Sequence, residues 1–262
     1  MNILEKIIAY KKPVLAKKKQ QIPLDKLKES TFFDREIISV SERFKQPTAT
    51  GIIAEFKRRS PSKPAINLNA DVLEVATAYE RAGATALSVL TDEHFFGGNI
   101  DDIKQIRNHI NIPILRKDFI FDEYQIYEAK SIGADFILLI AEVLSKQRVM
   151  DLAKTAHDLN LEVLLEIHSE EQLPKINKYI DLLGINNRNL KTFEVSIQNS
   201  INLINKVPGH LIKVSESGIK KPDNISLLRA NGFQGFLIGE SFMKTVNPGK
   251  ALQSFIAYSL KN

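Results

Sequence analysis

Short runs of Val, Ile and Leu recur along the chain, and each is about as long as one buried β-strand. They predict strands at 52–56, 86–90, 112–115, 136–140, 163–167, 182–185, 211–214 and 233–238. Between several of these runs the apolar residues return every three or four positions, which predicts helices at 72–83, 124–134 and 145–160. Gly83 and Gly133 stand where the first two of these helices would end. Strand and helix therefore alternate at the spacing of βα units.

This alternation predicts a parallel sheet, and eight βα units close most naturally into a barrel. The alternative is an open doubly wound sheet, which would usually carry a glycine-rich turn after its first strand. Residues 57–63 contain no glycine, so the barrel is favoured. We predict an α/β protein with the (β/α)8 TIM-barrel fold, in a single domain over residues 1–262.

The first part of the chain, residues 1–47, precedes the barrel and predicts an N-terminal helical extension. Its apolar residues form a stripe with helical spacing: Ile3, Leu4, Ile7 and Ile8. Pro23 and Pro47 interrupt the segment. We expect the extension to cover part of a ligand site and the loop 57–64 to close over a ligand.

Polar side chains gather where the predicted strands end, which is where (β/α)8 barrels carry their chemistry. Because side chains alternate along a strand, Glu55 and Lys57 share the face of Ile53. By the same rule Lys117 shares the face of Leu115. If these two apolar residues point into the barrel, a polar group surrounds the mouth of its interior: Glu55, Lys57, Lys117, Glu166 and Asn186. The pattern predicts an active site there.

Each of these residues also has a structural interpretation. Glu55 and Lys57 could form an ion pair that only stabilises the end of the strand, and Lys117 could extend to solvent. Glu166 is harder to explain in this way, because buried carboxylates are rare unless they are paired or functional. The coincidence of such residues at several strand ends favours an active site.

Two glycine turns predict an anion subsite. Gly218 in VSESGI and Gly239 in LIGESF stand where a strand leads into a helix. Backbone N–H groups at such a turn suit a phosphate, and the loops after strands 7 and 8 often bind one in barrel enzymes. Glu240 could then help only through its backbone N–H, with its carboxylate turned away. The alternative is that both glycines merely serve tight turns.

The composition limits the function classes. The chain has no cysteine and its five histidines show no ligand spacing, so we expect neither a disulfide nor a metal site. Its first residues lack the uninterrupted apolar core and the cleavage site typical of a signal peptide, and no apolar run reaches about 18–20 residues, so we expect a soluble cytoplasmic protein. The net charge of +5 suits either nucleic acid or an anionic small molecule. The basic run 11–20 has no interleaved aromatic residues, so we interpret it as a solvated face and expect no nucleic-acid partner.

Six segments, taken in order, resemble the indole-3-glycerol phosphate synthase family: IIAEFKRRSPSKP, LSVLTDEHFFGGNIDDI, PILRKDFIFDEYQIYEA, LLGINNRNL, VSESGI and FLIGESFM. The likeness covers nearly the whole chain, including the N-terminal extension. The sister family, phosphoribosylanthranilate isomerase, shares the fold but would be expected to use a cysteine, and this chain has none.

The resemblance implies an enzyme of tryptophan biosynthesis that needs no cofactor. It would close 1-(2-carboxyphenylamino)-1-deoxyribulose 5-phosphate to indole-3-glycerol phosphate with loss of CO2 and water. Lys117 would be the general acid at the ribulose carbonyl, and Lys57 would hold the substrate carboxylate and act as the acid in dehydration. Glu55 and Glu166 would transfer protons, and Asn186 would orient the substrate. The implied substrate and phosphate contacts are Ser62, Phe95 or Phe96, Phe119, Arg188, Ser217, Gly218, Gly239 and Glu240.

Two rival interpretations stay open. One is another barrel lyase or isomerase that acts on a phosphorylated sugar, and the other is a non-catalytic basic binding protein. The favoured partner is an anionic phosphosugar substrate, with no membrane partner. We expect a monomer, and association with other enzymes of tryptophan biosynthesis is left open.

Overall fold

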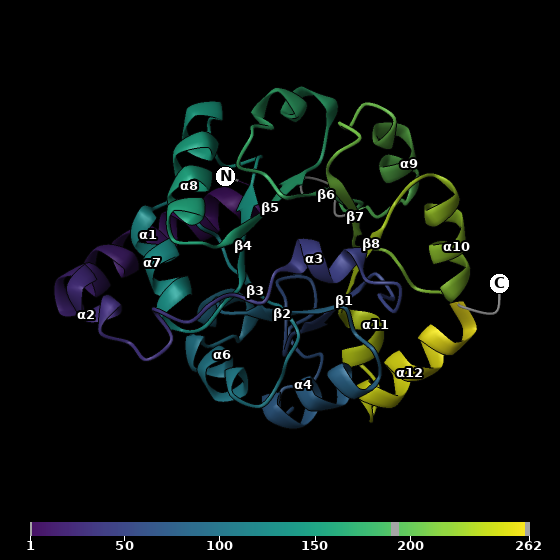
Figure 1. Ribbon diagram of the computed structural model, residues 1–262, viewed down its shortest axis with the longest axis horizontal. Helices are drawn as coiled ribbons and strands as arrows, with labels where there is room; N and C mark the ends of the chain where they lie inside the picture. Colours follow the sequence, from purple (N-terminus) through teal and green to yellow (C-terminus); the bar gives the residue numbers. More distant parts are fainter. Residues whose placement is uncertain (1, 190–193, 260–262) are drawn as a thin grey trace.

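The computed structural model describes residues 2–189 and 194–259, and its strands close into one parallel barrel (Figure 1). The strands are β1 (Ile52–Phe56), β2 (Ala86–Leu90), β3 (Ile114–Lys117), β4 (Phe136–Ile140), β5 (Glu162–Ile167), β6 (Leu182–Asn186), β7 (Ile212–Glu216) and β8 (Gly235–Ile238). Each strand pairs in parallel with the next, and β8 returns to pair with β1. The predicted (β/α)8 TIM barrel is confirmed. Leu190, which ends one of the motifs quoted above, lies outside the described residues.

The strand boundaries differ from the prediction at the C-terminal ends. β3 starts after Pro113 and continues through Lys117, although its apolar run stops at Leu115. β6 and β7 continue in the same way to Asn186 and Glu216. The backbone ladder goes on where the side chains become polar, so a run of apolar residues underestimates the strand.

Helices surround the barrel as an outer ring (Figure 1). They are α4 (Val72–Arg81), α5 (Glu93–Phe96), α6 (Ile100–Arg107), α7 (Glu123–Ser131), the longer α8 (Lys146–Asp158), the 3-10 helix η1 (Glu170–Lys175), α9 (Gln198–Ile204), α10 (Pro222–Ala230), α11 (Glu240–Met243) and α12 (Pro248–Ser259). The three predicted helices are α4, α7 and α8. Side-chain oxygens of Asp71, Asp122 and Ser145 accept the free N–H groups at their first turns.

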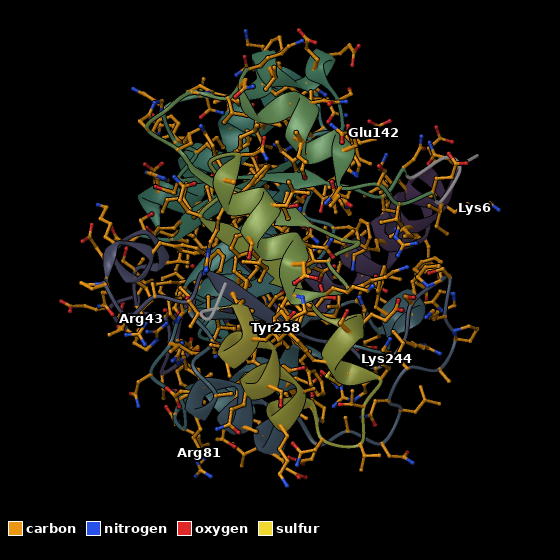
Figure 2. All side chains as sticks on the ribbon, turned by 90° about the vertical axis from the view of Figure 1, so that its right-hand side faces the viewer. Lys6, Arg43, Arg81, Glu142, Lys244 and Tyr258 are labelled. Carbon is orange, nitrogen blue, oxygen red and sulfur yellow. The ribbon has the colours of Figure 1, made fainter. Side chains whose placement is uncertain are left out.

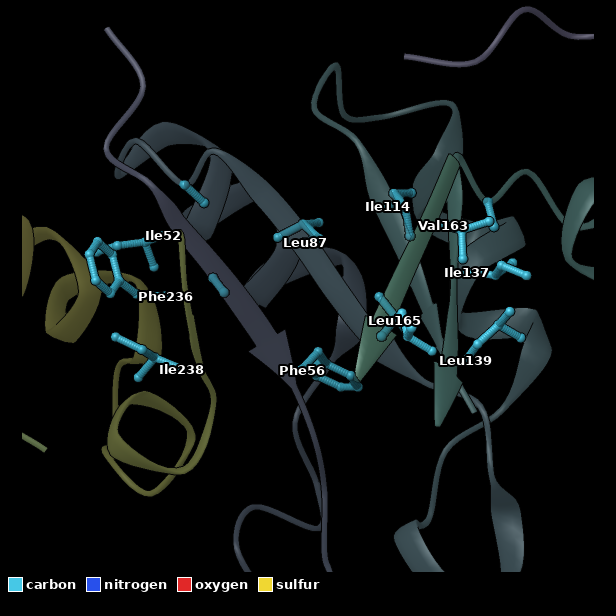
Figure 3. Close-up of a cluster of buried hydrophobic side chains, with 14 of the residues drawn as sticks. Ile52, Phe56, Leu87, Ile114, Ile137, Leu139, Val163, Leu165, Phe236 and Ile238 are labelled. Atoms are coloured by element: carbon cyan, nitrogen blue, oxygen red, sulfur yellow. The ribbon is translucent and has the colours of Figure 1, made fainter. Parts of the chain in front are cut away.

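Two apolar clusters sit on the two faces of the sheet. The larger one fills the space between strands and helices, and Figure 3 shows part of it, including Leu87 and Ile137. The other fills the barrel interior and contains Ile53, Leu115 and Leu164. Ile53 and Leu115 therefore point inward, as the prediction of the site assumed.

The N-terminal extension contributes three helices: α1 (Ile3–Gln21), α2 (Leu24–Lys28) and α3 (Val40–Lys45). α3 closes the N-terminal end of the barrel, where Val40 and Phe44 pack into the interior cluster (Figure 1). α1 lies at the opposite end. Figure 2 shows this arrangement from the side, with Arg43 of α3 at one end of the molecule and Lys6 of α1 at the other.

The interpretation of the basic run 11–20 as a solvated face is wrong for two of its lysines. Lys11 forms ion pairs with Asp92 and Asp118, and Lys18 forms one with Glu128. These carboxylates are buried, so the lysines fasten α1 to the barrel. Within residues 2–189 and 194–259, no helix has both the length and the apolar sequence that crossing a bilayer would require.

Candidate active site

A cavity of about 430 Å³ opens at the C-terminal ends of the strands. Thirteen of the fourteen predicted site residues line it: Glu55, Lys57, Ser62, Phe96, Lys117, Phe119, Glu166, Asn186, Arg188, Ser217, Gly218, Gly239 and Glu240. Phe95 is the exception. Residues from different strands and loops, far apart in the sequence, therefore meet in one cavity.

Glu55 and Lys57 form an ion pair at the end of β1. Lys57 Nζ donates to Glu55 Oε1 at 2.5 Å, and the Glu55 side chain is 6% exposed. The pair faces the cavity, so the ammonium and the carboxylate are both available to a ligand.

Lys117 lies between two buried carboxylates. Its Nζ is 3.6 Å from Glu166 Oε2 and 3.8 Å from Glu216 Oε2. Burial favours the neutral amine, but the carboxyl groups of Glu166, Glu216 and Glu55 outweigh it and raise the pKa of Lys117. The side chain is therefore held as an ammonium ion.

Glu166 and Glu216 differ in the direction in which their pKa is shifted. Burial first, and then the charge of Glu166, raises the pKa of Glu216 well above its usual range. Burial also opposes ionisation of Glu166, but Lys117 and His168 outweigh it and lower its pKa. The pair thus holds one proton on Glu216 and one negative charge on Glu166.

Glu216 lines the cavity but is absent from the residues predicted for the site. The signal that could have found it is the alternation along β7, where Val214 points into the barrel interior and Glu216 shares its face. The apolar run that predicts this strand ends at Val214, and Glu216 lies two residues beyond it.

Asn186 and Arg188 extend the site along β6 and the loop behind it. Asn186 Oδ1 accepts the backbone N–H of Arg188 at 2.9 Å, and the Asn186 side chain also helps to lower the pKa of Glu166. This side chain therefore fixes both the ionised carboxylate and the start of the loop that carries the guanidinium.

The loops after β7 and β8 form the other wall. Ser217 and Gly218 both have a positive φ, of 66° and 76°, and Asn187 Nδ2 holds the turn by donating to Ser217 O at 3.0 Å. Ser241 Oγ donates to Ile219 O at 3.1 Å and so links the two loops. Gly239 immediately precedes α11. Both predicted glycine turns therefore face the same cavity.

The Glu240 carboxylate forms an ion pair with a lysine from another loop. Lys63 Nζ, from the loop after β1, lies 2.5 Å from Glu240 Oε1. The pairing lowers the pKa of this half-buried carboxyl even though burial alone would raise it. Ser62 and its neighbours in the β1 loop line the cavity, and closure of this loop over a ligand stays a prediction.

An apolar wall stands opposite the glycine turns. The rings of Phe96 and Phe119 lie 5.8 Å apart, centroid to centroid. Three residues of α1 complete this wall: Ile3, Leu4 and Ile7. The extension therefore covers part of the cavity, as expected. Phe95 instead packs edge-on against Tyr10, with ring centroids 5.6 Å apart.

Comparison with known proteins decides the family. The model of the indole-3-glycerol phosphate synthase family matches residues 4–255. The chain belongs to this family. A member from Bacteroides thetaiotaomicron named indole-3-glycerol phosphate synthase is 50% identical over 258 residues, which cover 97% of this chain and 98% of that protein. Another of the same name, from Polynucleobacter asymbioticus, is 42% identical and covers 98% of this chain and 99% of its own length.

Solved structures share the barrel with this member of the indole-3-glycerol phosphate synthase family. A 3-hexulose-6-phosphate synthase from Salmonella typhimurium matches with a TM-score of 0.63 and 11% identity, over 80% of this chain and 99% of its own. A tryptophan synthase structure from Pyrococcus furiosus matches with a TM-score of 0.61 and 14% identity, over 82% and 99%. At such identities the likeness concerns the fold alone.

Proposed function

We propose that this chain is an indole-3-glycerol phosphate synthase. It closes the ring of 1-(2-carboxyphenylamino)-1-deoxyribulose 5-phosphate and releases CO2 and water. The observation that carries the proposal is the ammonium group of Lys117, held between Glu166 and Glu216 inside a cavity that has aromatic side chains on one wall and two glycine turns on the other. Such a cavity suits a substrate with an aryl group at one end and a phosphate at the other.

Ring closure requires an acid at the ribulose carbonyl. The aryl carbon that bears the carboxylate attacks this carbonyl, and its oxygen gains negative charge as the bond forms. Lys117 supplies the proton because its carboxylate neighbours keep it charged. Lys57 holds the substrate carboxylate during the attack, and Asn186 orients the substrate hydroxyl groups.

Decarboxylation needs no further electron sink. Ring closure leaves a positively charged iminium group, which accepts the electron pair of the breaking carbon–carbon bond. Loss of CO2 also restores the aromatic ring. The intermediate thus does the work that a pyridoxal or thiamine cofactor does in other decarboxylases.

Dehydration uses a base and an acid in the same cavity. A carboxylate removes a proton from carbon while an ammonium group protonates the departing hydroxyl group, so that water leaves. Glu55 and Glu166 serve as the proton-transferring carboxylates, and Lys57 beside Glu55 serves as the acid.

The phosphate end is assigned to the glycine turns. Backbone N–H groups after Gly218 and at the start of α11 suit an oxyanion, and Arg188 adds positive charge. Ser62 and Ser217 add hydroxyl groups. Glu240 contributes its backbone N–H, since its carboxylate is engaged with Lys63. Phe96 and Phe119 flank the aryl ring.

A barrel lyase or isomerase for another phosphosugar is the main rival, and turnover distinguishes the two. The wild-type protein should consume the carboxyphenylamino substrate and generate indole fluorescence. The monomeric state, the cytoplasmic location and association with other pathway enzymes stay predictions.

Lys117→Ala tests the assignment of the general acid. We expect kcat to fall by several orders of magnitude, because ring closure loses its proton donor, while binding of the phosphate end survives. Lys12→Ala, which removes an exposed lysine from α1, should leave turnover unchanged. Wild-type activity in Lys117→Ala would overturn the role of Lys117.

A further inference from the structure

One ammonium group of the N-terminal helix joins two loops of the barrel. Lys11 Nζ lies 3.0 Å from Asp92 Oδ2 and 2.7 Å from Asp118 Oδ1. The Lys11 side chain is only 16% exposed, and each aspartate side chain is 2% exposed. A bridge this deeply buried constrains both loops, because movement of either carboxylate away from Lys11 would break a buried ion pair.

Each aspartate holds the backbone next to an aromatic residue of the cavity wall. Asp92 follows β2 and caps α5, with Oδ1 accepting the backbone N–H of Phe95 at 2.8 Å, and Phe96 follows directly. Asp118 follows β3, and its Oδ1 accepts the backbone N–H of Phe119 at 2.7 Å. Lys11 thus sits behind the two residues whose rings form the aryl wall.

Asp92 depends on Lys11 for charge compensation more than Asp118 does. Asp118 has other donors, with Thr91 Oγ1 at 2.7 Å and Arg116 Nη2 at 3.1 Å. Asp92 accepts only Lys11 among charged groups within ion-pair distance in the described part of the chain. Burial opposes the charge on Lys11, but Asp118 and Asp92 outweigh it and raise the pKa of Lys11. Without Lys11, Asp92 would be a buried carboxylate with no charged partner in the described part of the chain, whereas Asp118 would keep Arg116.

We propose that Lys11 is a positioning residue that sets the separation of Phe96 and Phe119 and thereby the fit of the substrate's aryl ring. The same helix supplies Leu4 and Ile7 to the apolar wall formed by Phe96 and Phe119. The position of the helix on the barrel therefore affects the shape of this wall. This inference rests on the proposed function, because it concerns how the aryl end of that substrate is bound.

The test separates the aryl end from the phosphate end of the ligand. Indole-3-glycerol phosphate carries both ends, and glycerol 3-phosphate carries only the second. Calorimetric titration of Lys11→Met should show about tenfold weaker binding of the first ligand and a change of less than about twofold for the second. KM for the substrate should rise by a similar factor, with kcat changed by less than about threefold, since the ring is held equally in ground and transition states.

Lys19→Met is the matched control. It removes another ion pair of α1, in which Lys19 Nζ lies 2.6 Å from Asp122 Oδ2 at the surface. Its binding of both ligands should equal that of the wild type. Equal losses in the two variants, or equal losses of the two ligands in Lys11→Met, would mean that Lys11 only docks the helix and would overturn the proposal. Unchanged binding of both ligands by Lys11→Met would overturn it as well.

Asp92→Asn keeps the proposal testable if Lys11→Met does not fold. The amide still caps α5 but loses the charge that binds Lys11. It should reproduce the loss confined to indole-3-glycerol phosphate, and wild-type binding would count against the proposal. Failure of the proposed function would look different, because the wild-type protein itself would then not turn over the carboxyphenylamino substrate.

Discussion

The buried carboxylates of the site need space as well as charge partners, and glycines provide it. A Cβ added to Gly184 of β6 would lie 2.0 Å from Glu216 Oε1. One added to Gly239 would lie 2.5 Å from Glu55 Oε1. Both distances are too short for real atoms, so each acid has its room because a glycine on another strand or loop has no side chain.

Gly184→Ala should damage catalysis more than folding. The methyl group would push the Glu216 carboxylate away from Lys117, so we expect kcat to fall at least about tenfold. The crowding should cost about 1–3 kcal/mol of unfolding free energy. Gly209→Ala is the control, because its Cβ would have no atom within 4 Å, and it should change neither quantity. Steady-state kinetics and urea unfolding measure both, and wild-type kcat in Gly184→Ala would contradict this account.

The limits of sequence reasoning are clearest at Glu216. Glu55 and Glu166 lie within their apolar runs, so alternation places them correctly. Lys117 and Glu216 each lie two residues beyond the apolar run of their strand, and both reach the inner face because the strand continues. Alternation carried past the run predicts Lys117, and carried equally far along β7 it would have predicted Glu216. The room left by Gly184 and the raised pKa of Glu216 beside Glu166 depend on contacts between the strands β5, β6 and β7. A sequence read strand by strand does not contain them.

The two ends of the barrel differ in the role of their residues. The candidate active site lies at the C-terminal ends of the strands, whereas the residues at the N-terminal ends stabilise the fold. The N-terminal ends of the strands are closed by the extension, which is held by buried charges. Asp135, just before β4, accepts from Arg107 Nη1 and Arg35 Nη2, both at 2.6 Å, and from the backbone N–H groups of Ile38 and Ile114. The Asp135 carboxylate thus links α6, β3 and residues 35–38, which lead into α3.

Asp135→Asn should unfold more easily without losing catalytic power. The amide leaves the buried guanidinium of Arg107 without its counter-charge, and breaking such a pair costs about 3–5 kcal/mol. Because the site lies at the other end of the barrel, kcat of the folded fraction should stay within about twofold of wild type. Asp101→Asn, which breaks an exposed pair with Lys104, should cost less than about 1 kcal/mol. Denaturant unfolding and kinetics at low temperature distinguish these outcomes, and a kcat loss in Asp135→Asn as large as its stability loss would refute the division.

The sequence predicts a helical extension, but it does not predict where on the barrel the extension packs. The stripe of Ile3, Leu4 and Ile7 indicated a buried helix face, but it fits any apolar surface. The position over the cavity is set by partners far away in the chain, such as Asp92 and Asp118 for Lys11. The helix α3 is similar, since Glu162 of β5 accepts the backbone N–H groups of Val40 and Ser41 at its start. Pairings over such sequence distances leave no local pattern.

The free energy of unfolding should depend on pH because Glu216 is buried. Unfolded, Glu216 has the ordinary pKa of 4.5, whereas in the folded chain burial and the charge of Glu166 raise that pKa well above 4.5. The folded state therefore keeps a proton that the unfolded state has lost. Stability is full below about pH 4.5 and falls as pH rises toward the folded pKa, by about 1.4 kcal/mol per pH unit.

Neighbouring groups act outside this window. The lowered pKa of Glu166 adds stability above 4.5 that is lost only as the solution becomes more acidic, and the raised pKa of Lys117 adds stability that is present throughout the range below 10.5. Between pH 5 and the folded pKa of Glu216, the slope from this cluster thus belongs to Glu216.

Glu216→Gln removes the ionisation and should remove the slope. We expect the free energy of unfolding of the variant, relative to wild type, to improve as pH rises from 5 toward the folded pKa of Glu216, because only the wild type must hold its proton against the solvent. Urea unfolding at several pH values measures the difference. Glu240→Gln, whose carboxyl has a lowered pKa, should show a constant difference over the same range. Parallel curves for wild type and Glu216→Gln would mean that the folded protein already carries an ionised Glu216 at pH 5. Lys117 would then face two full negative charges, and the shared proton between Glu166 and Glu216 would not exist.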